Sequence, residues 1–297
     1  FYLFPQVPKE YTIAPWHDFK SAVITYSFDD GSPNQCSVIP ILDKFGFKAS
    51  FNLIVEGWPK DWDCYIKAAK NGHEIASHTY THVTITNLPK DQEKKEIVDS
   101  KLYLEKKIGK EVVTLVYPFC NTGNNEIISK NYISARVCDE KYIGPNPDDI
   151  FTLSSFGIGK DYQRTSASQL NDMADKALQL EKWIVFLIHG IDGDGGFANM
   201  ESTVLESHFN YVKNNEDFWV GTFKDVSKYI LEANSLIIEE KVGGKDIEFK
   251  VDISYQTEVT KMDFPVTIAR SLEGLCSNPT VAKLDGEKVE SRVKHEK

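Results

Sequence analysis

"ITYSFDDG", residues 24–31, runs from strand-forming residues directly into two adjacent carboxylates and a glycine. Asp-Gly is a common turn dipeptide, because Asp hydrogen-bonds its own backbone and Gly tolerates a positive φ angle. A simple turn is therefore one interpretation. The other is that a buried strand delivers Asp29 and Asp30 to a functional site, and the rest of the sequence decides between the two.

The composition is that of an ordinary globular protein: of 297 residues, 41% are hydrophobic and 26% charged. The formal net charge is −10, and such an acidic surface repels phosphate backbones, so we expect no nucleic-acid partner. The longest apolar runs, such as 183–188, are too short for a transmembrane segment. The first residue is Phe and not Met, from which we expect a processed chain.

The cysteines are widely spaced and form no CxxC pair. Their odd number, in a chain of this length, argues against a disulfide framework and against a cysteine zinc site. We expect most of them to be small buried side chains. They are Cys36, Cys64, Cys120, Cys138 and Cys276.

Strand-like and helix-like segments alternate up to about residue 233. Such repeats indicate parallel strands, because parallel neighbours need a crossover connection. The strands are nearly continuous apolar runs, as expected where helices cover both faces of a sheet. About seven units predict an α/β fold, a distorted (β/α) barrel, with an open doubly wound sheet as the alternative. The expected strands are 21–28, 48–55, 73–78, 112–119, 133–138, 183–189 and 218–223; the expected helices are 34–46, 60–72, 89–109, 166–181, 201–214 and one ending near 233.

After about residue 235 the helical period is absent. Residues 245–255 alternate apolar and polar side chains, residues 264–272 are rich in strand formers, and "LDGEK" (284–288) is a hairpin-turn signal. The sequence therefore predicts two domains: a (β/α) barrel over 1–234 and a small antiparallel β domain over 235–297.

Polar side chains stand at the ends of several predicted strands. The carboxyl ends of parallel barrel strands form one rim, where active sites lie. His78 and His82 would share one face if the chain makes a helical turn there. With Asp30 they would form a two-His, one-carboxylate metal site with open positions for water and substrate. We expect a divalent cation, with Zn²⁺ first among the candidates.

Two adjacent aspartates at the same strand end suggest that each has a different chemical role. Asp29 would act as the general base while Asp30 binds the metal. His189, at the end of the strand 183–189, would be the general acid. The backbone N–H of Phe119 would donate to a developing oxyanion.

Four motifs, "SFDDG", "SHTYTH", "VYPF" and "LIH", occur in an order and spacing that resembles the polysaccharide deacetylase family (NodB-like, carbohydrate esterase family four) over about residues 20–230. The resemblance implies a distorted barrel, metal-dependent removal of acetyl groups from an acetylated glycan, and an extracytoplasmic location. It implies the same roles for the residues above. It also implies that Leu187 helps to wall the pocket for the acetyl methyl group.

The sequence departs from the family at the position of an arginine beside the base. Many members carry this arginine two residues before the proline of the third motif, where this chain has Val116. Some relatives supply it from a later strand, but 151–159 has serines, including Ser155. We therefore expect a loosely held base and a slow enzyme. Asp161 is the candidate for the carboxylate that orients the acid.

Aromatic residues near the strand ends are candidates for sugar binding, although half-buried core aromatics are common too. They are Trp58, Trp62 and Tyr117.

Three functions remain open on the sequence alone. The first is a deacetylase acting on an amide or an ester, and the second is a glycan-binding protein that keeps the metal site with little catalysis. The third is an iron oxygenase with a two-His, one-carboxylate site, against which the parallel strand–helix pattern and His189 argue. A nucleophilic Cys120 would need its own base and oxyanion site. The sequence does not indicate the oligomeric state.

Overall fold

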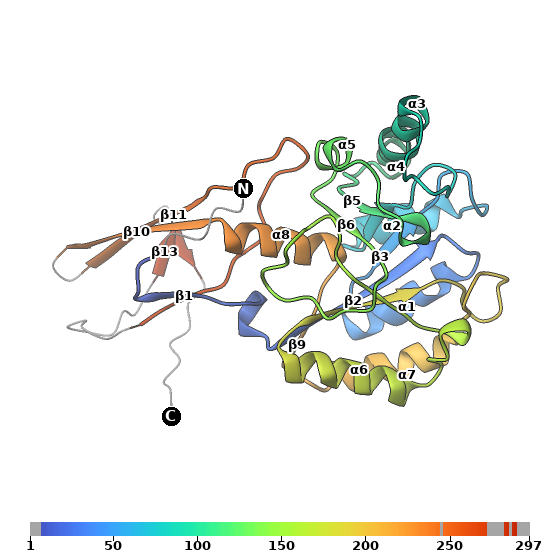
Figure 1. Ribbon diagram of the computed structural model, residues 1–297. Helices are drawn as coiled ribbons and strands as arrows, with labels where there is room; N and C mark the ends of the chain where they lie inside the picture. Colours follow the sequence, from blue (N-terminus) through green and yellow to red (C-terminus); the bar gives the residue numbers. More distant parts are fainter. Residues whose placement is uncertain (1–6, 244–245, 272–281, 285–286, 290–297) are drawn as a thin grey trace.

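The computed structural model describes residues 7–243, 246–271, 282–284 and 287–289 (Figure 1). Its centre is an eight-stranded sheet in the order β6-β5-β4-β3-β2-β8-β7, with β9 paired to β2. The strand pairs of this sheet are parallel, so the distorted (β/α) barrel expected from the sequence is confirmed. The strands are β2 (Ala22–Asp30), β3 (Ser50–Leu53), β4 (Glu74–Ser77), β5 (Thr114–Val116), β6 (Ser134–Arg136), β7 (Phe156–Gly157), β8 (Trp183–Ile188) and β9 (Phe218–Val220).

Helices follow most of these strands, and most of them begin or end at recognisable caps. The first ends at Gly46, whose φ of 74° is the left-handed value that favours glycine. Another begins with a capping box between Ser166 and Gln169. No helix of the described residues is long and apolar enough to cross a membrane. The helices are α1 (Gln35–Phe45), α2 (Trp62–Lys70), α3 (Lys90–Lys94), α4 (Ser100–Ile108), α5 (Asn125–Ser129), α6 (Ala167–Leu180), α7 (Ser202–Lys213) and α8 (Phe223–Asn234).

The long helix predicted over 89–109 is interrupted by a π-helical turn, η2 (Lys95–Asp99), between α3 and α4. A π turn inside a helix is rare and is frequent at functional sites. Here it buries Glu96, whose carboxylate reaches the site described below.

Two disulfides contradict the expectation that the cysteines are unpaired. Cys36 of α1 bonds Cys64 of α2, and Cys120 bonds Cys138, which follows β6. The partners are 28 and 18 residues apart in sequence and are brought together only by the packing of neighbouring units. A nucleophilic role for Cys120 is therefore also wrong. Cys276 lies outside the described residues.

Antiparallel pairs make up the β-rich part of the chain. β10 (Leu236–Gly243) pairs with β11 (Asp246–Ile253), and β1 (Tyr11–Ile13) pairs with β12 (Ile268–Arg270). In Figure 1, α8 leads from the central sheet toward these strands. The predicted hairpin is present as the pair β13 (Ala282–Leu284) and β14 (Glu287–Val289), although residues 285–286 of its turn lie outside the described residues.

Phe264 connects the segment after β11 to the barrel. Its ring lies 5.5 Å from that of Trp219 and 6.2 Å from that of Tyr229 of α8, measured between centroids. One residue earlier, Asp263 forms an ion pair with Lys228 at 2.9 Å. The tail is thus packed against α8 and β9, and a domain boundary at residue 235 stays a prediction.

His208 of α7 is a buried core imidazole. Its ring meets those of Tyr26 and Phe186 edge-on, and its Nδ1 lies 2.7 Å from Oδ1 of Asn171. Nε2 has no hydrogen-bond partner among the described residues. Burial lowers the pKa of His208 from 6.5 to about 3. The folded chain therefore keeps this imidazole neutral in mild acid.

We expect His208 to make the fold sensitive to acid. As the pH falls below 6.5, His208 binds a proton in the unfolded chain but stays neutral in the folded chain, so the free energy of unfolding falls. His208→Gln should remove about 2 kcal/mol of the stability lost between pH 7 and pH 5. Ser207→Ala, at an exposed and non-titrating position of the same helix, is the control and should not change that loss. Urea denaturation at both pH values measures it, and equal losses in all three proteins would contradict the prediction.

Candidate active site

Asp29 and Asp30 are the last two residues of β2, at the carboxyl edge of the sheet. Because side chains of a strand alternate between its two faces, the carboxylates point in different directions. Asp29 is buried, and Asp30 is half-buried with a φ of 74°. These two residues are therefore not a simple turn: the strand places both carboxylates at the rim of the sheet.

Asp30 forms a three-residue cluster with two histidines. Its Oδ1 lies 3.4 Å from Nε2 of His78 and 3.6 Å from Nε2 of His82. One ligand atom from each residue lies within 4.8 Å of the other two. The Oδ1 atom is buried and makes no hydrogen bond to any other described residue. Two imidazole nitrogens and one unsatisfied carboxylate oxygen fit a divalent cation such as Zn²⁺.

The two imidazoles meet through a loop, and not through the helical turn on which the sequence analysis had made their pairing conditional. Thr79 and His82 have φ angles of 69° and 59°, and the N–H of His82 donates to Oγ1 of Thr79. The ring centroids of His78 and His82 are 4.7 Å apart. Nδ1 of His78 lies 2.9 Å from the carbonyl oxygen of Val116, which leaves Nε2 free to face Asp30.

Glu96 of the π turn holds this loop in place. Its carboxylate accepts hydrogen bonds from the N–H groups of Tyr80 and Thr81, and from the Thr81 hydroxyl, at 2.6 to 2.9 Å. Non-glycine residues with positive φ are costly, and they persist only where surrounding contacts fix them. Sequence reasoning missed Glu96, which lies in an otherwise regular helical pattern.

The three candidate ligands shift one another's pKa. Burial raises the pKa of Asp30, but the nearby imidazoles outweigh it and lower the value to about 2. Burial lowers the pKa of His78, yet Asp30 and Asp29 outweigh it and raise that pKa. The pKa of His82 is lowered by burial and by His78. A proton on His78 therefore competes with a cation as the pH falls.

Asp29 borders this cluster, with Oδ2 at 3.9 Å from Nε2 of His78, but its hydrogen-bond partners are different, and here the structure corrects the sequence analysis. Nη2 of Arg136, the last residue of β6, donates to Oδ2 of Asp29. Nδ2 of Asn52, beside Asp29 on β3, donates to Oδ1 at 2.7 Å. The expectation of a missing arginine is therefore wrong: β6 supplies it, and Ser155 accepts a hydrogen bond from Arg136 Nη1. Asp29 thus has a partner on each carboxylate oxygen.

His189 follows β8 and faces the same rim. Gln35 and Ser32 donate to its carbonyl oxygen at 2.9 and 3.2 Å, which fixes the backbone there. Burial lowers the pKa of the imidazole. Its Nδ1 is buried without a hydrogen-bond partner in the described part of the chain. Asp161 is exposed and makes no hydrogen bond to His189, so the expectation that it orients this ring is not met.

Phe119 lies in η3 (Pro118–Cys120), directly after β5, and is 62% exposed. Its φ is 54°, and its ring centroid is 4.8 Å from that of His82. The N–H groups of Cys120 and Asn121 close the turn, so the turn does not use the N–H of Phe119. Leu187, the candidate for the acetyl-methyl pocket, and Tyr117, a candidate for sugar binding, are both buried.

Aromatic side chains surround the mouth of the site. Trp58 is 38% exposed and lies beside Gly195, and Phe197 is 52% exposed and meets the ring of His189 edge-on at 5.1 Å. Tyr162 stacks near His189, with centroids 6.5 Å apart. Sequence reasoning missed Phe197 and Tyr162. Trp62 instead packs against Tyr103 and Lys107 of α4.

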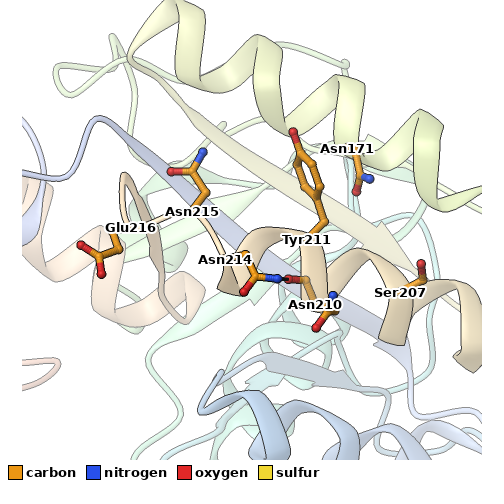
Figure 2. A pocket seen from close by; sticks show the side chains of 7 residues that line it. All are labelled: Asn171, Ser207, Asn210, Tyr211, Asn214, Asn215 and Glu216. Atoms are coloured by element: carbon orange, nitrogen blue, oxygen red, sulfur yellow. Dashed lines mark hydrogen bonds between the residues drawn. The ribbon is translucent and has the colours of Figure 1, made fainter.

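A groove between α6 and α7 contains none of these residues (Figure 2). It encloses about 550 Å³ and is lined almost entirely by amide and hydroxyl groups. The phenol of Tyr211 already donates to Asp175. The groove brings no acid, base or metal ligand together. Its lining residues are Asn171, Ser207, Asn210, Tyr211, Asn214, Asn215 and Glu216.

Comparison with known families adds the decisive observation. Residues 17–132, which contain both aspartates, both clustered histidines and Phe119, match the family model described as "Polysaccharide deacetylase". Over this stretch the chain is similar to polysaccharide deacetylases. The match covers the first half of the barrel, and His189 lies beyond it.

Two of the similar curated proteins are much longer than this chain. A gellan lyase from Bacillus sp. is 24% identical over 89% of the chain, which spans 12% of that protein. The peptidoglycan-N-acetylmuramic acid deacetylase PdaC of Bacillus subtilis (strain 168) is 29% identical over 57% of the chain, and the match spans 38% of PdaC. The chain thus covers less than half the length of these relatives.

Solved structures share the fold of the barrel. The Xyl-CE4 domain of a multidomain xylanase from the hindgut metagenome of Trinervitermes trinervoides is 21% identical, with a TM-score of 0.51 over 69% of this chain and 89% of its own. A family 4 acetyl xylan esterase from Clostridium thermocellum, solved with a cobalt ion, is 17% identical, with a TM-score of 0.50 over 69% and 89%. Puue allantoinase is 13% identical, with a TM-score of 0.56 over 73% and 92%.

The three-residue cluster predicts a single divalent cation. His82→Ala and Asp30→Ala should each lose it, because each change removes one of three ligand atoms. The measurement is metal content by mass spectrometry after loading with Zn²⁺ and desalting. His17→Ala, a histidine remote from the cluster, should keep the full content. Full occupancy in both ligand variants would contradict the assignment.

The buried pair of Arg136 and Asp29 makes a prediction that is independent of activity. Arg136→Met should lower the free energy of unfolding by about 3 kcal/mol or more, because it leaves a buried carboxylate with half its partners. In an Asp29→Asn background the same change should cost clearly less. Arg164→Met, which removes the partly exposed pair with Glu140, is the control and should cost below about 1 kcal/mol. Equal costs for the two arginines would refute the account.

Proposed function

We propose that the barrel is a metal-dependent hydrolase that removes acetyl groups from a glycan. The observation that carries this proposal is the separation of two adjacent aspartates into different clusters. Asp30 meets two imidazoles and has an unsatisfied oxygen, whereas Asp29 is paired with Arg136 and Asn52. One carboxylate is thus available to a cation, and the other is fixed as a proton acceptor.

The bound cation would supply Lewis acidity and lower the pKa of a water molecule. Asp29 accepts the proton of the attacking water, and its two partners keep the carboxylate in one orientation. The N–H of Phe119 donates to the oxyanion that develops on the acetyl group. His189 protonates the leaving oxygen or nitrogen, and its lowered pKa makes its protonated form the stronger acid.

The rim supports a carbohydrate substrate. Exposed aromatic faces at Trp58, Phe119 and Phe197 suit the flat apolar faces of sugar rings. PdaC is named for deacetylating a peptidoglycan sugar. An amide of an amino sugar is therefore the first substrate class we propose, with acetyl esters of hemicellulose as the second. Leu187 would contact the acetyl methyl group.

The proposed surroundings are extracytoplasmic. Two disulfides in the described residues suit an oxidising compartment. Zn²⁺ is the cation we propose first, because two nitrogens and one oxygen are a common catalytic zinc set. The β-rich part beyond residue 235 would contribute no reacting group.

A glycan-binding protein without efficient catalysis is the second candidate, and it has lost its main support. It rested on an absent arginine, and Arg136 occupies that role from β6. The expectation of a slow enzyme is withdrawn for the same reason.

Acetate release across a panel of acetylated glycans tests the function. In Asp29→Asn the rate should fall about a hundredfold or more, the usual scale for losing a general base. Metal content should be unchanged, because Asp29 is not a proposed ligand. Asp161→Asn, an exposed carboxylate, is the control and should release acetate at the wild-type rate. If wild type and Asp29→Asn release acetate at one trace rate on every glycan, the protein is a binder.

A further inference from the structure

The disulfide Cys120–Cys138 joins two segments that each carry a group of the proposed reaction. Cys120 directly follows Phe119, whose N–H faces the developing oxyanion in the mechanism above. Cys138 lies two residues after Arg136, which holds Asp29. Neither cysteine belongs to the three-residue metal cluster. The cross-link thus connects the two groups that orient the base and the oxyanion.

Little else holds these segments together. The ladder between β5 and β6 ends with the hydrogen bond from the N–H of Tyr117 to the carbonyl oxygen of Arg136. Beyond it, no hydrogen bond of the described residues joins 118–124 to 137–140. Phe119 and Cys120 have φ angles of 54° and 60°. Consecutive non-glycine residues in this region need an external constraint to stay there.

Cys138 is also linked to Arg136 through Val137 and Ser155. Nη1 of Arg136 donates to Oγ of Ser155, and this hydroxyl donates to the carbonyl oxygen of Val137 at 2.8 Å. Val137 is bonded directly to Cys138. A movement of the chain at Cys138 would therefore shift Ser155 and with it the guanidinium of Arg136.

We propose that Cys120 and Cys138 are positioning residues, whose disulfide aligns the Phe119 N–H and the Arg136–Asp29 pair for the reaction. The inference rests on the proposed function. The cross-link acts on the turnover step, because misplacing such groups by about an ångström costs up to about a hundredfold in rate. Metal content should change little, since the proposed ligands come from β2 and the loop after β4, and Glu96 holds that loop independently of the cross-link.

The second disulfide provides the matched control. Cys36 and Cys64 lie within the helices α1 and α2, whose backbones are held by their own hydrogen bonds. Removing either disulfide deletes one cross-link. Only the pair of Cys120 and Cys138 bridges a strained turn to the strand of the arginine.

The experiment compares Cys120→Ser/Cys138→Ser with Cys36→Ser/Cys64→Ser. We expect the first to lose about tenfold or more in kcat with KM and metal content nearly unchanged, and the second to stay within about threefold of wild type. In an Arg136→Met background, removing Cys120 and Cys138 should cost less, because one of the two groups that they position is gone. Equal kcat in both double variants and wild type would overturn the inference.

Reduction provides a route that needs no refolding of the first variant. In folded Cys36→Ser/Cys64→Ser, a water-soluble phosphine cleaves the bond between Cys120 and Cys138. The disulfide takes two electrons from the phosphine and becomes two thiols, and the phosphine becomes its oxide with an oxygen atom from water. Activity should fall by the same factor and return on reoxidation. Activity that is insensitive to reduction, with both thiols titrated, would overturn the inference.

Hydrogen exchange separates this inference from the proposed function. Without the cross-link, amides in 117–124 and 134–140 should exchange about tenfold faster or more, while those in 73–82 stay unchanged. If wild type releases no acetate from any glycan, the proposed function fails. The hydrogen-exchange rates then still test whether the disulfide holds the two segments in place. Unchanged exchange in both segments would overturn it.

Discussion

The structure depends on how two adjacent acids at the end of β2 are kept apart. Asp29 and Asp30 would repel each other in a poorly solvated site unless each has its own partners. Alternation along the strand sends them to different faces, where Arg136 and Asn52 bind one and two imidazoles surround the other. This separation gives neighbouring residues different chemistry and keeps the proposed base out of the proposed ligand set.

The parallel sheet makes that separation possible over a long stretch of sequence. The carboxyl ends of β2, β3, β6 and β8 meet at one edge, so residues more than 100 positions apart become neighbours. Strands carry Asp29, Asp30, Asn52 and Arg136, whereas two loops carry the histidine pair and Phe119. Each loop is fixed from outside: Glu96 holds the histidine loop, and the disulfide ties down the turn of Phe119.

The sequence predicted those features that depend on local pattern or on a strand end. The spacing of apolar residues predicted the barrel and a helical stretch where α3, η2 and α4 lie. The positions of polar residues at strand ends predicted the grouping of Asp30 with His78 and His82. Arg136 could not be found this way, because it sits in an apolar strand without a motif and reaches Asp29 only through sheet order. The prediction of unpaired cysteines was wrong for the same reason. The spacing of cysteines in the sequence does not show which helices and strand ends are neighbours in the fold.

The most direct test of the central claim is a crystal structure of the metal-loaded protein with the cation located by anomalous scattering. The account predicts one ion bonded to Asp30, His78 and His82, with Asp29 still paired to Arg136 and not bonded to the ion. An ion bound by Asp29, or one bound away from His78 and His82, would contradict it.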